Sequence, residues 1–328
     1  RSHRSFAFLA MRCLLRHVRP TAAGRMRALS QTRASQPADA RPDPSDPSRF
    51  MRRSYWEEYH EKSDLSHEWF LEPSKCLEVL LPTVQTVCSS QSSSTKDRDA
   101  LRALHVGCGT STLGIELARS SLTMKSSLHV SNVDFSKNAI EAMRKARSQS
   151  PDAAATLNEW ILADLLSLPF ENCHFDLILD KGTFDAFEAS DAGRRRDEGG
   201  PGPAESLCNE VDRVLKRHLD SAWLQITHSA PELRLEVLHA SLPQVGPRAL
   251  PQGWQISYRS LGEDETGFEY FVYFVRRRPM FELVRLREGE ASQLGIFVDE
   301  SQALAAASDA AGEHQQQVAV RPLSQSRL

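Results

Sequence analysis

The chain has 328 residues, of which 40% are hydrophobic and 25% are charged. This apolar fraction suffices for a core but lies below the usual range, so part of the chain is expected to stay unpacked. The net charge of -3 is unevenly spread, because residues 1–38 contain eight Arg and no Asp or Glu. The other 32 basic residues of the total of 40 face 43 acidic ones, and this acidic balance disfavours nucleic acid as a partner.

The N-terminal 38 residues have the composition of a targeting segment. They are rich in Arg, contain Ser and lack acids, and Leu14, Leu15 and Val18 can share one face of a short helix. This composition is typical of a mitochondrial transit peptide, so residues 1–38 are predicted to direct the protein to the mitochondrial matrix. The alternative is a basic arm that binds an anionic partner, with the protein in the cytoplasm. No membrane span is expected, because no apolar run is long enough.

Four segments are predicted between the targeting segment and the first strand. They are a linker over 39–53, helices over 54–62 and 74–87, and a Ser-rich spacer over 89–100. In the first helix Tyr55 and Tyr59 lie one turn apart, and Pro73 is a favourable residue just before the second.

From Leu101 onward, strand-like and helix-like patterns alternate, which is typical of a doubly wound sheet. Four strands are predicted to end near Val106 and at Asp134, Asp164 and Asp180, and a fifth strand is predicted near 221–227. Helices are predicted over 111–120, 137–148 and 204–218. Two further runs rich in strand formers, 254–258 and 270–275, are expected to form an antiparallel pair. The fold class predicted is therefore α/β: a seven-stranded, Rossmann-like, doubly wound sheet, mostly parallel, with an antiparallel C-terminal hairpin.

The domain is expected to cover residues 54–278, followed by a C-terminal extension over 279–328. The extension lacks a clear pattern, except that Ala303–Ala311 is compatible with a helix, and its polar end is expected to be partly disordered.

The six cysteines occur singly along the chain, at positions 13, 76, 88, 108, 173 and 208. They show neither the paired spacing of a zinc site nor a disulfide framework, so no metal is expected and a reducing compartment is favoured. Cys108 lies in a glycine turn, where a small residue is needed, although a catalytic thiol is the alternative there.

The most informative motif is the turn Gly107-Cys108-Gly109, which follows a predicted strand. Glycine lets the backbone approach a ligand where a Cβ would clash. Asp134 ends the next strand, 25 residues after Gly109, where its carboxylate can accept hydrogen bonds from ribose hydroxyls. A dinucleotide fingerprint needs a third glycine at the position of Thr112, so a ligand with a ribose and no phosphate fits better. S-adenosylmethionine is such a ligand.

Two more acids end predicted strands on the same side of the sheet. Asp164, followed by Leu165, is placed to meet an adenine amino group, and Asp180 is placed beside the expected position of the sulfonium methyl group. The purely structural alternative is that such acids only cap helices or form turns.

The order and spacing of these strand ends resemble the class I S-adenosylmethionine-dependent methyltransferases. The run Asp180-Lys181-Gly182-Thr183-Phe184-Asp185-Ala186 resembles a signature of the group that contains the citrate synthase and elongation factor 1A lysine methyltransferases. Ser54-Tyr55-Trp56, His67-Glu68-Trp69-Phe70 and Ser229-Ala230-Pro231 are supporting matches, and the resemblance covers roughly residues 54 to 276.

The resemblance implies a monomeric enzyme that uses S-adenosylmethionine and methylates a lysine of a protein substrate, with citrate synthase or a translation factor as candidates. Asp180 and Lys181 are the expected catalytic residues. The expected cofactor-binding residues are Gly107, Cys108, Gly109, Asp134, Phe135, Asp164, Leu165, Tyr55 and Trp56.

Several alternatives remain open at this point. Lys181 could form a purely structural salt bridge with Asp180, and the aromatic residues near Trp56 could be core packing rather than a lid over the cofactor. At the level of function, the alternatives are a methyltransferase of a small molecule, a nicotinamide-dependent oxidoreductase, and a cofactor-binding scaffold without turnover.

Overall fold

The computed structural model describes most of the chain beyond residue 46. The described ranges are 47–62, 68–91, 100–124, 127–149, 152–191, 200–243, 253–264, 267–277, 281–287, 290–297, 300–314 and 317–322. The predicted transit peptide and residues 39–46 of the predicted linker lie outside these ranges.

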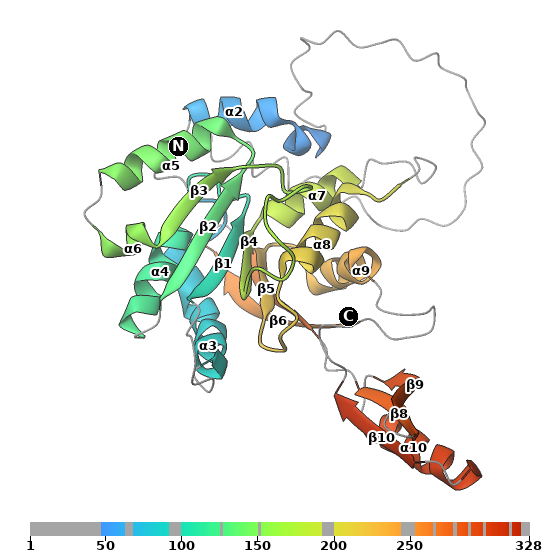
Figure 1. Cartoon of the computed structure of the whole chain (residues 1–328). Helices are drawn as coiled ribbons and strands as arrows, with labels where there is room; N and C mark the ends of the chain where they lie inside the picture. Colours follow the sequence, from blue (N-terminus) through green and yellow to red (C-terminus); the bar gives the residue numbers. More distant parts are fainter. Residues whose placement is uncertain are drawn as a thin grey trace, which may run out of the picture.

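A seven-stranded sheet forms the centre of the domain, in the order β3-β2-β1-β4-β5-β7-β6 (Figure 1). The first five strands pair in parallel, and β7 pairs antiparallel with both β5 and β6. The predicted fold class is therefore confirmed. The strands are β1 (Leu101–Val106), β2 (Leu128–Asp134), β3 (Asn158–Leu162), β4 (Leu177–Lys181), β5 (Ala222–Thr227), β6 (Trp254–Glu263) and β7 (Glu269–Arg277).

Helices cover both faces of this sheet, and each face has its own apolar cluster. One cluster joins the sheet to α3 (Pro73–Gln91), α4 (Leu113–Thr123) and the short α6 (Ala153–Thr156). The other joins it to α7 (Thr183–Asp191), α8 (Pro203–Val214) and α9 (Pro231–Ser241). Because both faces are covered, the central strands are buried along nearly their whole length, as parallel strands usually are.

Three elements surround the carboxyl ends of the strands. The helix α5 (Lys137–Ser148) packs over β3 through a small cluster that includes Met143 and Trp160. The 3-10 helix η1 (Pro47–Met51) contacts α7, and α2 (Arg53–Lys62) contacts α5. Figure 1 shows α2 lying alongside α5.

A second, three-stranded sheet follows the main sheet and was not predicted from the sequence. It consists of β8 (Phe281–Arg287), β9 (Glu290–Phe297) and β10 (Gln317–Pro322), in the order β10-β8-β9, with α10 (Glu300–His314) packed against it. Leu283, Val284 and Ala303 are buried. The predicted helix near Ala303–Ala311 lies within α10, whereas the strand β8 was missed although charged and apolar residues partly alternate in it.

Within the described ranges, no helix is both long enough and apolar enough to cross a membrane. The same residues contain no group of three His, Cys, Asp or Glu side chains placed to hold a metal ion.

Candidate active site

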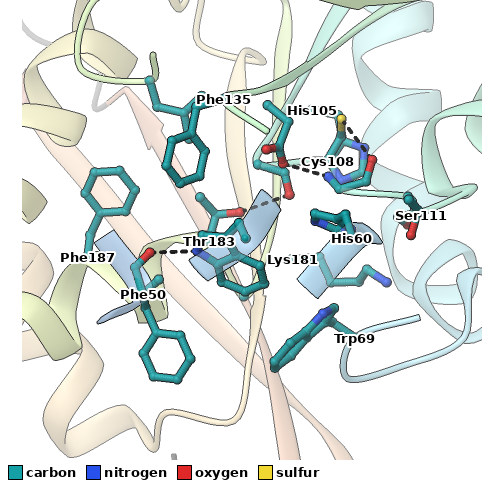
Figure 2. Close-up of a pocket in the computed structure, with 18 of the residues that line it drawn as sticks. Phe50, His60, Trp69, His105, Cys108, Ser111, Phe135, Lys181, Thr183 and Phe187 are labelled. Atoms are coloured by element: carbon teal, nitrogen blue, oxygen red, sulfur yellow. Dashed lines mark hydrogen bonds between the residues drawn. The ribbon is translucent and has the colours of Figure 1, made fainter. Parts of the chain in front are cut away.

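A cavity of about 240 Å³ lies at the carboxyl ends of the parallel strands, where ligands of open α/β sheets bind. Figure 2 shows Phe50, Phe135 and Phe187 on one side of it and His105, Cys108 and Ser111 on the other. The lining residues are Phe50, Met51, Trp56, His60, Glu68, Trp69, Phe70, His105, Gly107, Cys108, Gly109, Thr110, Ser111, Asp134, Phe135, Asp164, Leu165, Leu166, Lys181, Gly182, Thr183, Ala186 and Phe187.

The glycine turn of Gly107, Cys108 and Gly109 forms part of the cavity wall. Gly107 and Gly109 have φ angles of 56° and 51°, a backbone conformation that favours glycine. The hydroxyl of Thr183, at the start of α7, donates to the carbonyl of Val106 at 3.0 Å, so its side chain lies directly against the turn. A Cβ on Gly107 would stand 2.2 Å from Oγ1 of Thr183. The turn is therefore closely packed on its protein side.

Asp134 lines the cavity at the end of β2 and is 5% exposed. One carboxylate oxygen accepts from the backbone N–H of Gly109 and the other from that of Ser136, both at 2.8 Å. Each oxygen keeps a second lone pair that can accept a ribose hydroxyl. Burial raises the pKa of Asp134 to about 6, although these two N–H groups act in the opposite direction. The position and chemistry of Asp134 thus fit the predicted ribose site.

Phe135, Asp164 and Leu165 also line the cavity. Asp164 lies two residues beyond the end of β3, and its carboxylate accepts from the backbone N–H of Leu166 at 2.9 Å. The carboxylate of Asp164 therefore stabilises a turn and also faces the cavity, so a role in cofactor binding and a role in turn formation are compatible. The apolar Phe135 and Leu165 side chains beside an acid suit a flat heterocycle with an exocyclic amine.

His105 is a buried cavity residue that the sequence did not single out. Its Nδ1 lies 3.2 Å from Oδ1 of Asn132, whose Nδ2 donates to Oδ1 of Asn158 at 3.0 Å. Since the Asn132 amide nitrogen is used elsewhere, Nδ1 of His105 is assigned as the donor and Nε2 as the acceptor. Burial, assisted by the charge of Lys181, lowers the pKa of His105 to about 4, so the imidazole is neutral at physiological pH.

Lys181 lines the cavity and forms a buried ion pair with Glu68, not with Asp180. The side chains of Lys181 and Glu68 are 3% and 7% exposed. The interpretation of Asp180 and Lys181 as a structural salt bridge is therefore wrong. Burial raises the pKa of Glu68, but the charge of Lys181 and hydrogen bonds that include the N–H of Thr112 outweigh this effect and lower it.

Asp180 is buried but is not among the residues that line the cavity. Its carboxylate accepts from the backbone N–H groups of Thr183, at 2.9 Å, and Phe184, at 3.2 Å, in the first turn of α7. Burial, and then the neighbouring Asp185, raise its pKa to about 7. The expectation that Asp180 faces an acceptor beside the methyl group is corrected here: this geometry favours a capping role, and Lys181 is the residue of the pair that faces the cavity.

The N-terminal segment contributes a row of four rings to the cavity wall. The centroids of Phe50, Trp56, Trp69 and Phe70 follow one another at 6.1, 5.6 and 6.5 Å, and we call these four residues the aromatic row. Tyr55 was predicted to bind the cofactor, but it does not line the cavity and packs edge-on against Phe50 at 5.4 Å. The row is thus a wall of the cavity, and the prediction of a lid applies to Trp56 but not to Tyr55.

Phe70, the last residue of the aromatic row, has an unusual backbone conformation. Its φ angle is 62°, which is uncommon for a bulky residue. Its ring lies so close to Gly182 that a Cβ there would stand 2.7 Å from Cε2 of Phe70. The ring also contacts His228 at 5.0 Å and Tyr270 at 5.8 Å between centroids. The glycine of the Asp-Lys-Gly-Thr run therefore makes room for the row.

A buried charge cluster lies beneath the site, between α7 and α9. The fully buried guanidinium of Arg234 contacts Asp185 at 2.9 Å, Glu188 at 3.1 Å and the hydroxyl of Thr227 at 3.0 Å. Arg234 also stacks over the ring of Phe184, at 4.7 Å from its centroid. This cluster fixes α7, whose first turn carries Thr183, relative to the end of β5.

The role of Asp134 can be tested through pH. We expect Asp134→Asn to weaken binding of S-adenosylmethionine about tenfold or more, because a charged acceptor of hydrogen bonds is lost. In the unaltered protein, affinity should fall as the pH is lowered through about 6, where Asp134 becomes protonated, and Asp134→Asn should remove this dependence. Calorimetric titration between pH 5.5 and 8 measures both effects.

Asp152→Asn is the matched control, because Asp152 caps α6 through the N–H of Ala154 without lining the cavity. Equal affinities of Asp134→Asn and Asp152→Asn for S-adenosylmethionine would contradict the assignment of Asp134 to a ribose site.

Comparisons with known proteins place this chain near methyltransferases. The family described as "Methyltransferase domain" matches residues 97–218. The EEF1A lysine methyltransferase 4 of Bos taurus is 26% identical over 238 residues, which cover 72% of this chain and 79% of that protein. The mitochondrial citrate synthase-lysine N-methyltransferase of Pongo abelii is 29% identical over 237 residues, covering 68% and 85%.

A solved structure, the magnesium protoporphyrin IX methyltransferase from Synechocystis PCC 6803, has a TM-score of 0.40 and 15% identity, and covers 73% of this chain and all of that one. The glycine turn, Asp134 and the Asp164 turn fit S-adenosylmethionine, and the family matched over residues 97–218 includes all three. The chain is therefore similar to S-adenosylmethionine-dependent methyltransferases, its fold is a doubly wound α/β sheet, and its cavity residues fit S-adenosylmethionine as the cofactor.

Proposed function

We propose that the chain is a protein-lysine N-methyltransferase. The observation that carries this proposal is the aromatic row, which lines the cavity next to the end of β4, beside Lys181 and Gly182. A lysine side chain presents a long apolar stem and an amine, and a wall of rings along such a stem buries it without requiring polar partners. The same faces attract cationic groups such as a sulfonium through cation–π contacts.

The aromatic row also favours the neutral form that the acceptor lysine needs for this reaction. When bound, S-adenosylmethionine supplies a methyl group on a positively charged sulfur. The acceptor lysine must reach it as a neutral amine, against an ordinary pKa of about 10.4. Exclusion of water by Phe50, Trp69 and Phe70 disfavours the ammonium form, and the cation of Lys181 at the same wall is already neutralised by Glu68. The chain thus lowers the pKa of the acceptor by its surroundings, with no covalent intermediate on the enzyme.

The relatives support a protein acceptor. Two of them are named for lysine methylation of two different proteins, a translation factor and citrate synthase. We propose citrate synthase as the first candidate substrate, with a translation factor of the EEF1A type as the second. The mitochondrial relatives and the Arg-rich residues 1–38 support a location in the mitochondrial matrix. The acidic balance beyond residue 38 suits a basic protein surface around the target lysine.

The test is methyl transfer to defined proteins. We expect the full chain to transfer a labelled methyl group from S-adenosylmethionine to a protein of a mitochondrial lysate, and to purified citrate synthase at a lysine. Mass spectrometry locates the modified residue, and replacement of that lysine by Arg should abolish the label. Purified EEF1A is the matched competitor substrate.

Labelling that persists on a substrate after all of its lysines are replaced would contradict lysine as the acceptor. Labelling confined to small molecules of the lysate would instead favour the small-molecule alternative.

A further inference from the structure

Two glutamates, Glu57 and Glu68, each lie next in sequence to a ring of the aromatic row. Glu57 follows Trp56 in α2, and Glu68 precedes Trp69. Neither residue was singled out in the sequence as functional, and Glu57 does not line the cavity. Both carboxylates bond to parts of the chain that are distant in sequence, at separations of 44 to 113 residues.

Glu57 bonds to the start of α5. Its carboxylate accepts from the hydroxyl of Ser136 at 3.0 Å, from the N–H of Lys137 at 2.8 Å and from the N–H of Asn138 at 2.9 Å. The carbonyl of Glu57 also accepts from Nδ2 of Asn138 at 3.0 Å. The first turn of α5 contains no acidic residue of its own, so Glu57 supplies the negative charge that the positive end of this helix favours.

Glu68 bonds in the same manner to the start of α4. It accepts from the N–H of Thr112 at 2.8 Å and from its hydroxyl at 3.3 Å, and it pairs with Lys181 from β4. The side chain of Thr112, the residue before α4, makes no capping hydrogen bond itself. Ser111 accepts locally from the N–H of Leu113 at 3.2 Å, and Glu68 adds a charged acceptor at the same helix start from the segment that carries Trp69 and Phe70.

The two helix starts lie directly after the two loops that form the cofactor site. The helix α4 follows the turn that contains Gly107 and Gly109, and α5 follows Asp134. Each glutamate thus connects one part of the aromatic row to one cofactor-binding loop. A cofactor that lies between these loops and the row is enclosed as long as both connections hold.

We propose that Glu57 and Glu68 are positioning residues that hold the aromatic row against the two cofactor-binding loops and thereby set how long the cofactor stays bound. Cofactor exchange then requires that the row separate from at least one helix start. At the start of α5 the partners of Glu57 are backbone N–H groups and a hydroxyl, all of which water can replace. Its ion pair with Arg53 of the same helix, at 3.3 Å, is not broken when the helices part, so separation at α5 leaves no unpaired buried charge. The contact of Glu68 includes the buried cation of Lys181, so breaking it costs more free energy than breaking the contact of Glu57 with α5.

The experiment measures association and dissociation rates of S-adenosylhomocysteine by stopped-flow fluorescence of the full chain, in which Trp56 and Trp69 are two of five tryptophans. We expect Glu57→Gln to raise the dissociation rate about tenfold, because charged hydrogen bonds are lost, with an association rate within about twofold of the original. Glu68→Gln should raise it at least as much.

Glu58→Gln is the matched control, since Glu58 is exposed and pairs with Lys62 of its own helix, at 2.5 Å. Its rates should not change. Melting temperatures without cofactor distinguish the proposed role from a merely structural one. A merely structural role would lower the melting temperature and the fraction of protein that binds the cofactor product, but it would leave the dissociation rate of the protein that still binds unchanged.

Asn138→Asp tests the same contact from the α5 side, because it places a second carboxylate against Glu57, and it too should accelerate dissociation. An unchanged dissociation rate in Glu57→Gln and Asn138→Asp, or a loss of affinity that arises only from slower association, would overturn the proposal. Because the probe is the cofactor product, the result does not depend on which acceptor the enzyme methylates.

Discussion

Substitution of Gly107 by Ala is expected to reduce affinity for S-adenosylmethionine about a hundredfold or more. The added Cβ would stand 2.2 Å from Oγ1 and 2.7 Å from Cγ2 of Thr183, and the φ angle of 56° is unfavourable for any residue with a Cβ. The left-handed conformation alone costs about 1–2 kcal/mol. The contact with Thr183 adds to this, because the hydroxyl is held by the carbonyl of Val106 and cannot move away without losing that bond.

Gly262→Ala separates these two causes. Gly262 has a φ angle of 80°, but nothing lies within 4 Å of the position of its Cβ. It therefore carries the conformational penalty without the contact, and it lies in β6, away from the cavity lining. Calorimetric titration with cofactor and thermal melting of both variants give the comparison. Similar cofactor affinities for Gly107→Ala and Gly262→Ala would show that the close packing of the turn does not matter for binding.

Substitution of Arg234 by Met is expected to lower the free energy of unfolding by about 3–5 kcal/mol, the cost of removing one partner from a buried ion pair. Met fills much of the same space, but Asp185 and Glu188 then lose their cation in an interior where Arg234 is fully buried. Burial already raises the pKa of Glu188, and the charge of Arg234 acts against that effect. A carboxyl with a raised pKa in the folded state destabilises the fold as the pH rises, so the deficit of the variant should grow with pH.

Denaturant unfolding at several pH values measures this prediction. Arg119→Met is the matched control, because Arg119 also bridges two carboxylates, Glu116 and Asp152, but its side chain is 47% exposed. Exposed pairs of this kind contribute about 0–1 kcal/mol. Equal destabilisation by both substitutions would mean that burial does not decide the contribution of the Arg234 cluster.

The sequence was sufficient to predict the sheet, the glycine turn after β1 and acids that follow β2 and β3 closely, because short local patterns of residues specify these features, although β3 ends at Leu162 and not at Asp164. Asp180 shows the limit of such patterns. Successive side chains of a strand point to opposite faces, so an uncertainty of one residue at a strand end reverses the side that faces a ligand. The strand β4 continues to Lys181, and it is Lys181 that reaches the cavity, while Asp180 turns toward α7.

Other parts of the site depend on contacts that no local pattern contains. Glu57 and Glu68 bond to helix starts at least 44 residues away, and neither helix start shows in its own sequence that a distant carboxylate bonds to it. Tyr55 and Trp56 are neighbours on a helix, about 100° apart, and only their packing decides which ring lines the cavity. His105 carries no recognisable motif, and its neutral state follows from burial and from Lys181.

The position of β7 between β5 and β6 has a consequence for synthesis on the ribosome. β6 precedes β7 in the chain but reaches the sheet only through it, so both must be translated before either can pair fully. Until residues 269–277 emerge, β5 is the growing edge of the sheet, and its six residues, all buried in the finished domain, are exposed along that edge. Unpaired apolar edges of this kind invite association with other chains. The nascent chain is thus most vulnerable to aggregation between the translation of β5 and that of β7, which makes this interval the one in which a chaperone would matter most.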